Sequence, residues 1–145
     1  MRLPFLIRAA TFAGAAALGA GAPPAALAAE QQPLLQTPLS QAPGRQLTAV
    51  RVTYAPGQST PPHRHSGDAF VYVLAGRIRS QLAGGAVHVY GAGDSWFEPA
   101  GTPHRISGNA SAHEPASMLV IFVAAPRAAL TTLDQPMTAA RTQSR

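Results

Sequence analysis

Residues 70–90 read FVYVLAGRIRSQLAGGAVHVY, and this stretch decides the fold class. Its first five side chains are all apolar, which is typical of a strand buried on both faces. After Gly76, polar and apolar side chains alternate through residues 77–82. Gly84-Gly85 then supplies the positive φ angles of a tight turn before residues 86–90 return. The stretch predicts a buried strand followed by a β-hairpin.

The flanking sequence continues in the same way. Short β-rich runs separated by Gly or Pro occupy residues 47–54, 95–98, 104–107 and 117–124, and no amphipathic helix of three turns is present between them. Six to eight short strands at turn spacing predict a sandwich or barrel. We therefore expect an all-β, single-domain jelly-roll β-barrel. Pairing into a homodimer would help so small a unit, and the sequence leaves the oligomeric state open.

The amino-acid composition excludes several classes of function. The chain has 145 residues, the size of one domain, and its lack of cysteine excludes a disulfide scaffold, a thiol nucleophile and a zinc finger. All 11 basic residues are arginines, and they are scattered singly against 6 acids. Because no basic cluster exists, we expect no nucleic-acid partner.

The first 28 residues have the parts of a secretory signal peptide. Arg2 and Arg8 precede the uncharged, small and apolar residues 9–22, and Pro23-Pro24 and Ala26-Leu27-Ala28 follow. The apolar run is shorter than the roughly 20 residues that a membrane-spanning helix needs. We expect cleavage near Ala28, a periplasmic or secreted protein, and no stable membrane anchor. The alternatives are a retained membrane helix and a disordered leader.

The rest of the chain divides by composition. Residues 29–44 carry three prolines and no periodicity, which predicts an extended arm or linker. The β-barrel is expected over residues 45–126. Residues 127–145 are polar and aperiodic, which predicts a flexible C-terminal tail.

Three histidines are the candidate metal ligands. His63 and His65 are two residues apart, so on a strand both imidazoles point to the same face and can bind one ion. His104 follows a turn-forming stretch at residues 99–103 and begins another predicted strand. The alternative for the His63–His65 pair is a structural, hydrogen-bonded role.

Two spaced blocks of residues resemble the cupin superfamily, and more narrowly its small exported single-domain members. The resemblance extends over about residues 47–124, and two blocks together are more specific than one. The matching residues are Gly57, His63, His65 and Gly76 in the first block, and Gly93, Pro99, Gly101 and His104 in the second.

The resemblance implies a conical β-barrel that holds a divalent transition metal at its mouth. Three imidazole nitrogens with open positions suit Fe, Mn, Ni, Cu or Zn. The expected ligands are His63, His65 and His104.

The chain departs from the cupin pattern at one position. The pattern places a glutamate six residues before the glycine that ends the first block, and here that position is Ala69. Asp68 is the possible substitute, although strand alternation should turn it outward unless a bulge shifts the register. Glu98 is a weaker candidate, more simply explained as an acid at a strand edge.

Other side chains could line a substrate pocket between the metal and the base of the barrel. The alternatives are core packing for the apolar residues and a solvated outer face for the arginine. The candidates are Arg51, Val71, Tyr72, Val73, Trp96, Phe97 and Ile106.

Three classes of function remain. In the first, three neutral ligands would leave about three coordination positions for a small-molecule substrate, water or O₂, as in a metal-dependent dioxygenase or isomerase. The second class is a non-catalytic protein that binds a metal or a small ligand, and the third is a structural or stress protein in which the site is vestigial. No catalytic residue and no organic cofactor can be assigned from the sequence, and fold alone does not choose between the classes.

Overall fold

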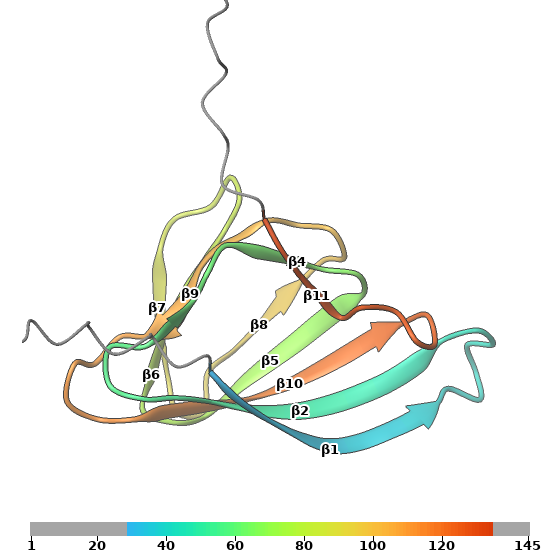
Figure 1. The fold of residues 1–145 in the computed structure, drawn as a ribbon, viewed down its shortest axis with the longest axis horizontal. Helices are drawn as coiled ribbons and strands as arrows, with labels where there is room; N and C mark the ends of the chain where they lie inside the picture. Colours follow the sequence, from blue (N-terminus) through green and yellow to red (C-terminus); the bar gives the residue numbers. More distant parts are fainter. Residues whose placement is uncertain (1–28, 135–145) are drawn as a thin grey trace, which may run out of the picture.

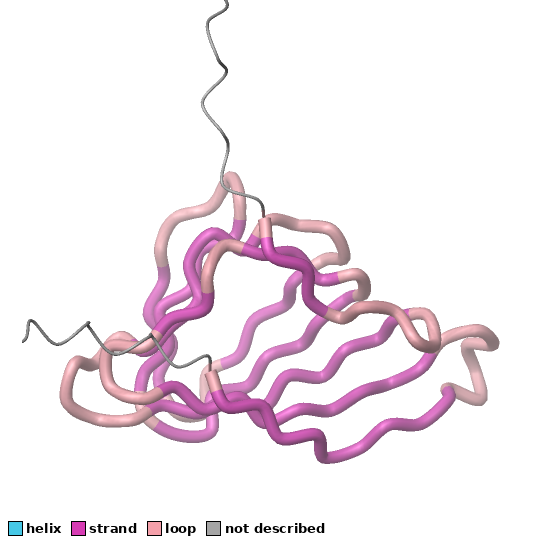
Figure 2. Tube along the Cα trace, viewed as in Figure 1, coloured by secondary structure: helices cyan, strands magenta, loops and turns pink. Residues whose placement is uncertain are grey.

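The computed structural model describes residues 29–134, and within them all regular structure is β-strand. Two antiparallel sheets face each other across the interior (Figures 1 and 2). The all-β jelly-roll prediction is confirmed. The predicted signal peptide, residues 1–28, and the last part of the predicted tail, residues 135–145, lie outside the described residues.

The first sheet has five strands in the order β1-β2-β10-β5-β8. Their bounds are β1 Glu30–Pro38, β2 Gln46–Tyr54, β10 Ala116–Ala124, β5 Asp68–Ala75 and β8 Ser95–Glu98.

The second sheet has the strand order β11-β4-β9-β6-β7, and the short strand β3 pairs with β9. The bounds are β11 Thr131–Leu133, β4 His63–His65, β9 His104–Asn109, β6 Arg77–Leu82, β7 His88–Gly91 and β3 Ser59–Thr60.

The core lies on the inner face of the five-stranded sheet. Burial alternates residue by residue along β5 and β10, because successive side chains of a strand point to opposite faces. The inward positions of these two strands include Val71, Val73, Val120 and Phe122, each at most 5% exposed. Burial of each such side chain contributes about 1.5–3 kcal/mol to the stability of the fold. Together these side chains pack behind the site.

Two segments outside the expected barrel are strands. Within the expected arm, β1 runs antiparallel to β2, and the register shifts between Pro33 and Leu35. Proline has no backbone N–H to donate, so an irregularity in an edge strand accommodates it. Within the expected tail, β11 pairs with β4, with Thr131 opposite His65. The β11–β4 pairing joins segments far apart in the sequence, so local composition carries no signal for it. β1 and β2 are consecutive strands, but the prolines and missing alternation of residues 29–44 conceal the first of them.

In the described part of the chain, residues 29–134, no helix has the length and apolar character needed to cross a membrane.

Candidate metal centre

The three histidines meet on the inner face of the second sheet. His63 and His65 both point inward from β4, while Arg64 between them is exposed and pairs with Asp134 at 2.9 Å. His104 begins β9 and lies directly opposite His63 in the β4–β9 pairing. One nitrogen from each of the three rings lies within 4.8 Å of the others. This group could hold a metal ion.

Each ring is held from its outer side by a second atom. Nδ1 of His63 lies 2.8 Å from the carbonyl oxygen of Pro61, and Nδ1 of His65 lies 3.1 Å from that of Leu130. Because a carbonyl oxygen only accepts, both Nδ1 atoms donate, so Nε2 is the nitrogen of each ring left to bind an ion. Nε2 of His104 lies 2.8 Å from the buried Ser80 hydroxyl. Such outer partners orient metal-binding imidazoles.

Burial also favours the neutral form of His63. Removal from water lowers the pKa of this imidazole, and this effect outweighs the Pro61 hydrogen bond, which raises the pKa. Smaller effects of His104 and His65 lower the pKa further, and Glu98 opposes them. A neutral imidazole is the form that binds a metal.

Glu98 is the fourth ionisable group of the site. It is 3% exposed, and its Oε2 lies 3.3 Å from His65 Nε2 and 3.2 Å from His104 Nδ1. Its Oε1 accepts a 2.7 Å hydrogen bond from the Trp96 indole. Burial alone would raise the pKa of this carboxyl, but the interactions with His104 and His65 together outweigh burial and hold the pKa well below its usual range. Glu98 is therefore a carboxylate.

The donor set fits a divalent cation. Within residues 29–134, the buried atoms Glu98 Oε2 and His104 Nδ1 face each other at 3.2 Å, but neither makes a hydrogen bond of good geometry. Buried polar atoms are nearly always satisfied, so this close contact needs an explanation. A transition-metal ion bound by the imidazole nitrogens would supply one.

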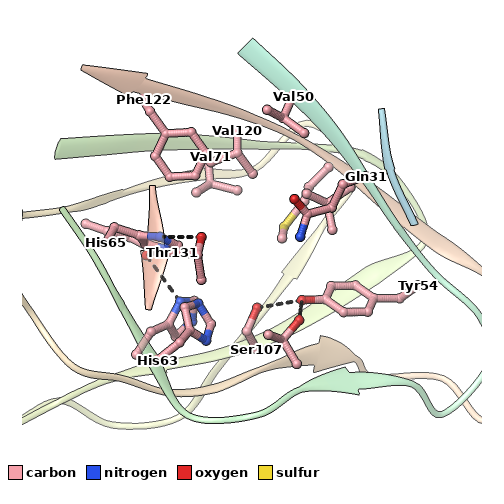
Figure 3. Close-up of a pocket in the computed structure, with 15 residues that line it drawn as sticks. Gln31, Val50, Tyr54, His63, His65, Val71, Ser107, Val120, Phe122 and Thr131 are labelled. Carbon is pink, nitrogen blue, oxygen red and sulfur yellow. Dashed lines mark hydrogen bonds and ion pairs between the residues drawn. The ribbon is translucent and has the colours of Figure 1, made fainter. Parts of the chain in front are cut away.

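A cavity opens beside the histidines (Figure 3). About 50 Å³ inside it is open to the centres of water-sized molecules, so a ligand that enters must be small. His63 and His65 lie at one end and Tyr54 at the other, as Figure 3 shows. The walls between them are mostly apolar, and they include Val50, Val52, Val71, Met118, Val120 and Phe122.

The far end of the cavity is polar. The Tyr54 hydroxyl lies 2.7 Å from the Thr60 hydroxyl and 2.9 Å from the Ser107 hydroxyl. Burial raises the pKa of Tyr54 above its ordinary value, so the phenol stays protonated. Gln31 from β1 and Thr131 from β11 complete the lining.

The predicted site residues separate into two groups. His63, His65, His104 and Val71 line the cavity, and Val73 is buried in the core behind it. Asp68 is exposed, and its carboxylate accepts a 2.9 Å hydrogen bond from the Ala100 backbone. It therefore lies outside the site, as strand alternation predicts.

Besides Val73 and Trp96, four of the predicted pocket residues do not line this cavity. Arg51, Tyr72 and Phe97 are exposed, because their strands turn the neighbouring residues inward instead. Ile106 is displaced by an irregularity in the pairing of β6 with β9, where Gln81 is opposite Ile106 and Leu82 is opposite His104. Ser107 takes the inward position.

Trp96 points inward but borders a second hollow, which lies between the β6–β7 hairpin and β8. Its ring stacks on Tyr90 with centroids 4.4 Å apart, and its indole N–H holds Glu98. Its contribution to the site is therefore made through Glu98.

The sequence interpretation underrated Glu98 and did not identify Tyr54, Thr60, Ser107, Gln31 and Thr131. A signal for Glu98 exists, because it shares a strand face with Trp96 two residues earlier. The polar residues carry no comparable local signal, since they converge from separate strands.

The fold and the site together define the class of protein. It is an all-β barrel with a histidine cluster beside an interior cavity. Residues 50–122 match the family model described as a cupin domain. The chain belongs to the cupin family.

Solved structures with the same fold support this assignment. A DMSP lyase, DddQ from Ruegeria pomeroyi DSS-3, is 27% identical with a TM-score of 0.56 over 64% of this chain, which spans only 45% of the lyase chain. A double-stranded β-helix protein from Klebsiella pneumoniae is 23% identical over 79% of this chain and 90% of its own, with a TM-score of 0.59.

A cupin-like protein from Thermotoga maritima is 19% identical over 74% of this chain and 77% of its own, with a TM-score of 0.58. The Klebsiella and Thermotoga likenesses are of fold alone. Among curated proteins, none matches this chain.

Proposed function

We propose that this cupin binds one divalent transition-metal ion through His63, His65 and His104 and takes a small molecule into the adjoining cavity. One observation carries the proposal. All three imidazoles have a hydrogen-bond partner outside the cluster, at Pro61, Leu130 and Ser80, while one nitrogen from each ring lies within 4.8 Å of the others. Outer partners of this kind orient the imidazoles of metal sites, and three rings that converge fit a metal site better than three separate structural roles.

The surrounding residues would prepare the site for a ligand. The apolar walls exclude water and strengthen electrostatic interactions inside the cavity. At the far end, the protonated Tyr54 hydroxyl offers a polar contact for a ligand that reaches across from the metal. A small, partly apolar molecule with an oxygen or nitrogen at each end fits this arrangement.

The bound metal would supply Lewis acidity or a redox centre that binds O₂. We propose a metal-dependent oxygenase or isomerase as the reaction class. The Ruegeria lyase, 27% identical over part of the chain, makes lyase substrates a further part of the screen. A non-catalytic protein that binds a metal or small ligand is the second candidate.

We also propose export to the periplasm or outside the cell. The charged start, apolar middle and Ala-Leu-Ala end of residues 1–28 support this proposal. Mass spectrometry of the protein recovered from the periplasm should find a chain that begins near Ala29. Recovery of the whole chain from the membrane fraction would contradict it.

Elemental analysis tests the metal site. The untagged protein, purified from the exporting compartment, should contain about one equivalent of a transition metal for a single mononuclear centre. His104→Ala should lose it. The matched control is His88→Ala, since His88 is exposed on β7 and outside the cluster.

The outcomes separate the two candidates. Metal in the wild type and in His88→Ala but not in His104→Ala supports the site. O₂ consumption or turnover of a substrate panel that includes dimethylsulfoniopropionate would then favour the enzyme. Stoichiometric metal without turnover would favour the binding protein, and no metal after reconstitution would overturn the proposal.

A further inference from the structure

We propose that Glu98 is the fourth protein ligand of this metal, supplied from β8 in place of the missing glutamate at position 69. The inference rests on the proposed metal site and goes beyond its three histidines. It also reassigns a residue that the sequence alone suggests is an ordinary strand-edge acid.

The register of β5 and β8 carries the first step. Ala69, at the position where the cupin pattern has its glutamate, is paired directly with Glu98. Both face the interior, with exposures of 0% and 3%. Directly opposed residues on one sheet face have Cβ atoms about 4.5–5.5 Å apart, so a glutamate side chain can span the difference. The small side chain of Ala69 leaves room at this position, and the side chain of Glu98 from the neighbouring strand β8 occupies it.

The positions of the imidazole nitrogens carry the second step. Nδ1 of His65 lies 3.1 Å from the Leu130 carbonyl oxygen, so the other ring nitrogen, Nε2, is the one that can meet an ion in the site. Nε2 of His65 lies 3.3 Å from Glu98 Oε2, and Nδ1 of His104 lies 3.2 Å from the same oxygen. One carboxylate oxygen thus faces a nitrogen of each of two candidate ligands, as it would around a shared ion.

The separations of Glu98 Oε2 from two of the imidazoles fit a shared ion. For metal–ligand bonds of about 2.1 Å, neighbouring ligand atoms are roughly 3.0–3.4 Å apart in octahedral or tetrahedral geometry. The two separations from Glu98 Oε2, 3.2 and 3.3 Å, both fall in this range.

Trp96 determines which carboxylate oxygen of Glu98 faces the metal site. Its indole N–H binds Oε1 at 2.7 Å, which leaves Oε2 turned toward the imidazoles as a single ligand atom. Asp68 has no such arrangement, because its side chain is exposed and bonded to the Ala100 backbone.

A carboxylate ligand changes the chemistry of the centre. It lowers the net charge of the site by one and adds a hard oxygen, which shifts preference toward Mn(II) or Fe(II) relative to a site of imidazoles alone.

Metal affinity and Co(II) absorption test the proposal without any activity assay. The full-length protein and its Glu98→Gln variant would be stripped, reloaded with Co(II) or Mn(II), and titrated calorimetrically. Glu98→Gln preserves the shape of the side chain and its contact with Trp96, and we expect at least about 100-fold weaker binding and a changed Co(II) visible spectrum. Asp68→Asn is the matched control and should change neither.

A second variant, the transplant, moves the carboxylate from position 98 to position 69. Ala69→Glu combined with Glu98→Ala returns the carboxylate to the cupin position, and we expect affinity within about tenfold of the wild type. Thermal unfolding and circular dichroism would show that each variant folds, and a Glu98→Gln variant that does not fold leaves the transplant as the deciding measurement.

The failures are distinguishable. Glu98→Gln that keeps the wild-type spectrum and binds within about tenfold, while His104→Ala loses the metal, would overturn the fourth ligand and leave the three-histidine site. A folded transplant that does not recover affinity would also overturn it. A wild-type protein that binds neither Co(II) nor Mn(II), nor Fe(II), Ni(II), Cu(II) or Zn(II), would overturn both proposals.

Discussion

Nδ1 of His65 lies 3.1 Å from the carbonyl oxygen of Leu130, so the C-terminal segment holds this imidazole from behind. The Thr131 hydroxyl lies 3.2 Å from the same nitrogen, and β11 pairs with β4 along this contact. Figure 1 shows the two strands side by side. Thus a short strand near the end of the described chain helps to orient a candidate ligand from the middle of the sequence.

This contact predicts that the C-terminal strand supports metal binding. Deleting residues 130–145 removes the acceptor that orients His65 and the Asp134 partner of Arg64. We expect metal affinity to fall about 10-fold to 100-fold, because outer partners of metal-bound histidines have effects of this size. The control deletes residues 135–145 only and should bind as the wild type does. Equal affinity of the two truncated proteins would contradict the prediction.

Ser80 should support the site through His104. Its hydroxyl is the outer partner of His104 Nε2, and both side chains are buried. Ser80→Ala should weaken metal binding by about tenfold and lower the free energy of unfolding by about 1–3 kcal/mol, since it leaves a buried nitrogen without a partner. Calorimetric titration and chemical unfolding measure the two effects. A loss of stability without any loss of affinity would show that His104 is oriented by other contacts.

The metal-free protein should lose stability on mild acidification. Burial lowers the pKa of His63 below its ordinary value of 6.5, so the unfolded chain binds more protons than the native one as the pH falls below 6.5. Stability is therefore greatest above this pH and declines below it, at up to about 1.4 kcal/mol per pH unit for one proton. The decline from His63 ends once the pH passes below its folded-state pKa.

Urea unfolding of the stripped protein between about pH 7.5 and pH 5 would measure this slope. His63→Ala should make it shallower, whereas the exposed His88→Ala should leave it unchanged. An equal slope in wild type and His63→Ala would contradict the assignment.

The β5–β6 turn offers a test of the fold itself. Gly76 has φ of 70°, and a Cβ there would lie 2.5 Å from the Pro115 carbonyl oxygen and 2.9 Å from Ala116. Gly84 has φ of 81° with nothing within 4 Å of its Cβ position. Gly84→Ala should therefore cost about 1–2 kcal/mol of stability from backbone strain, and Gly76→Ala clearly more. Thermal unfolding would compare them, and equal losses would show that the turn relaxes.

Most of the strands and the histidine cluster could be predicted from the sequence, because both depend on the alternation of side chains along a single strand. A period of two places His63 and His65 on one face wherever that strand lies, and it turns Asp68 outward and Val71 inward in the same way. Interrupting Gly and Pro residues mark where most strands end.

The position of Glu98 depends instead on which strands are neighbours and in what register. Its role follows from the pairing of β8 with β5 opposite Ala69, and the inward position of Ser107 in place of Ile106 follows from an irregularity in β9. The strands β1 and β11 likewise form only against β2 and β4. Alternation along a strand is a property of the local backbone, whereas neighbour, register and bulge follow from packing of the whole barrel. The sheet face to which each candidate ligand points could thus be derived from the sequence. Which other side chains lie beside it is decided only when the strands pair and pack in the folded barrel.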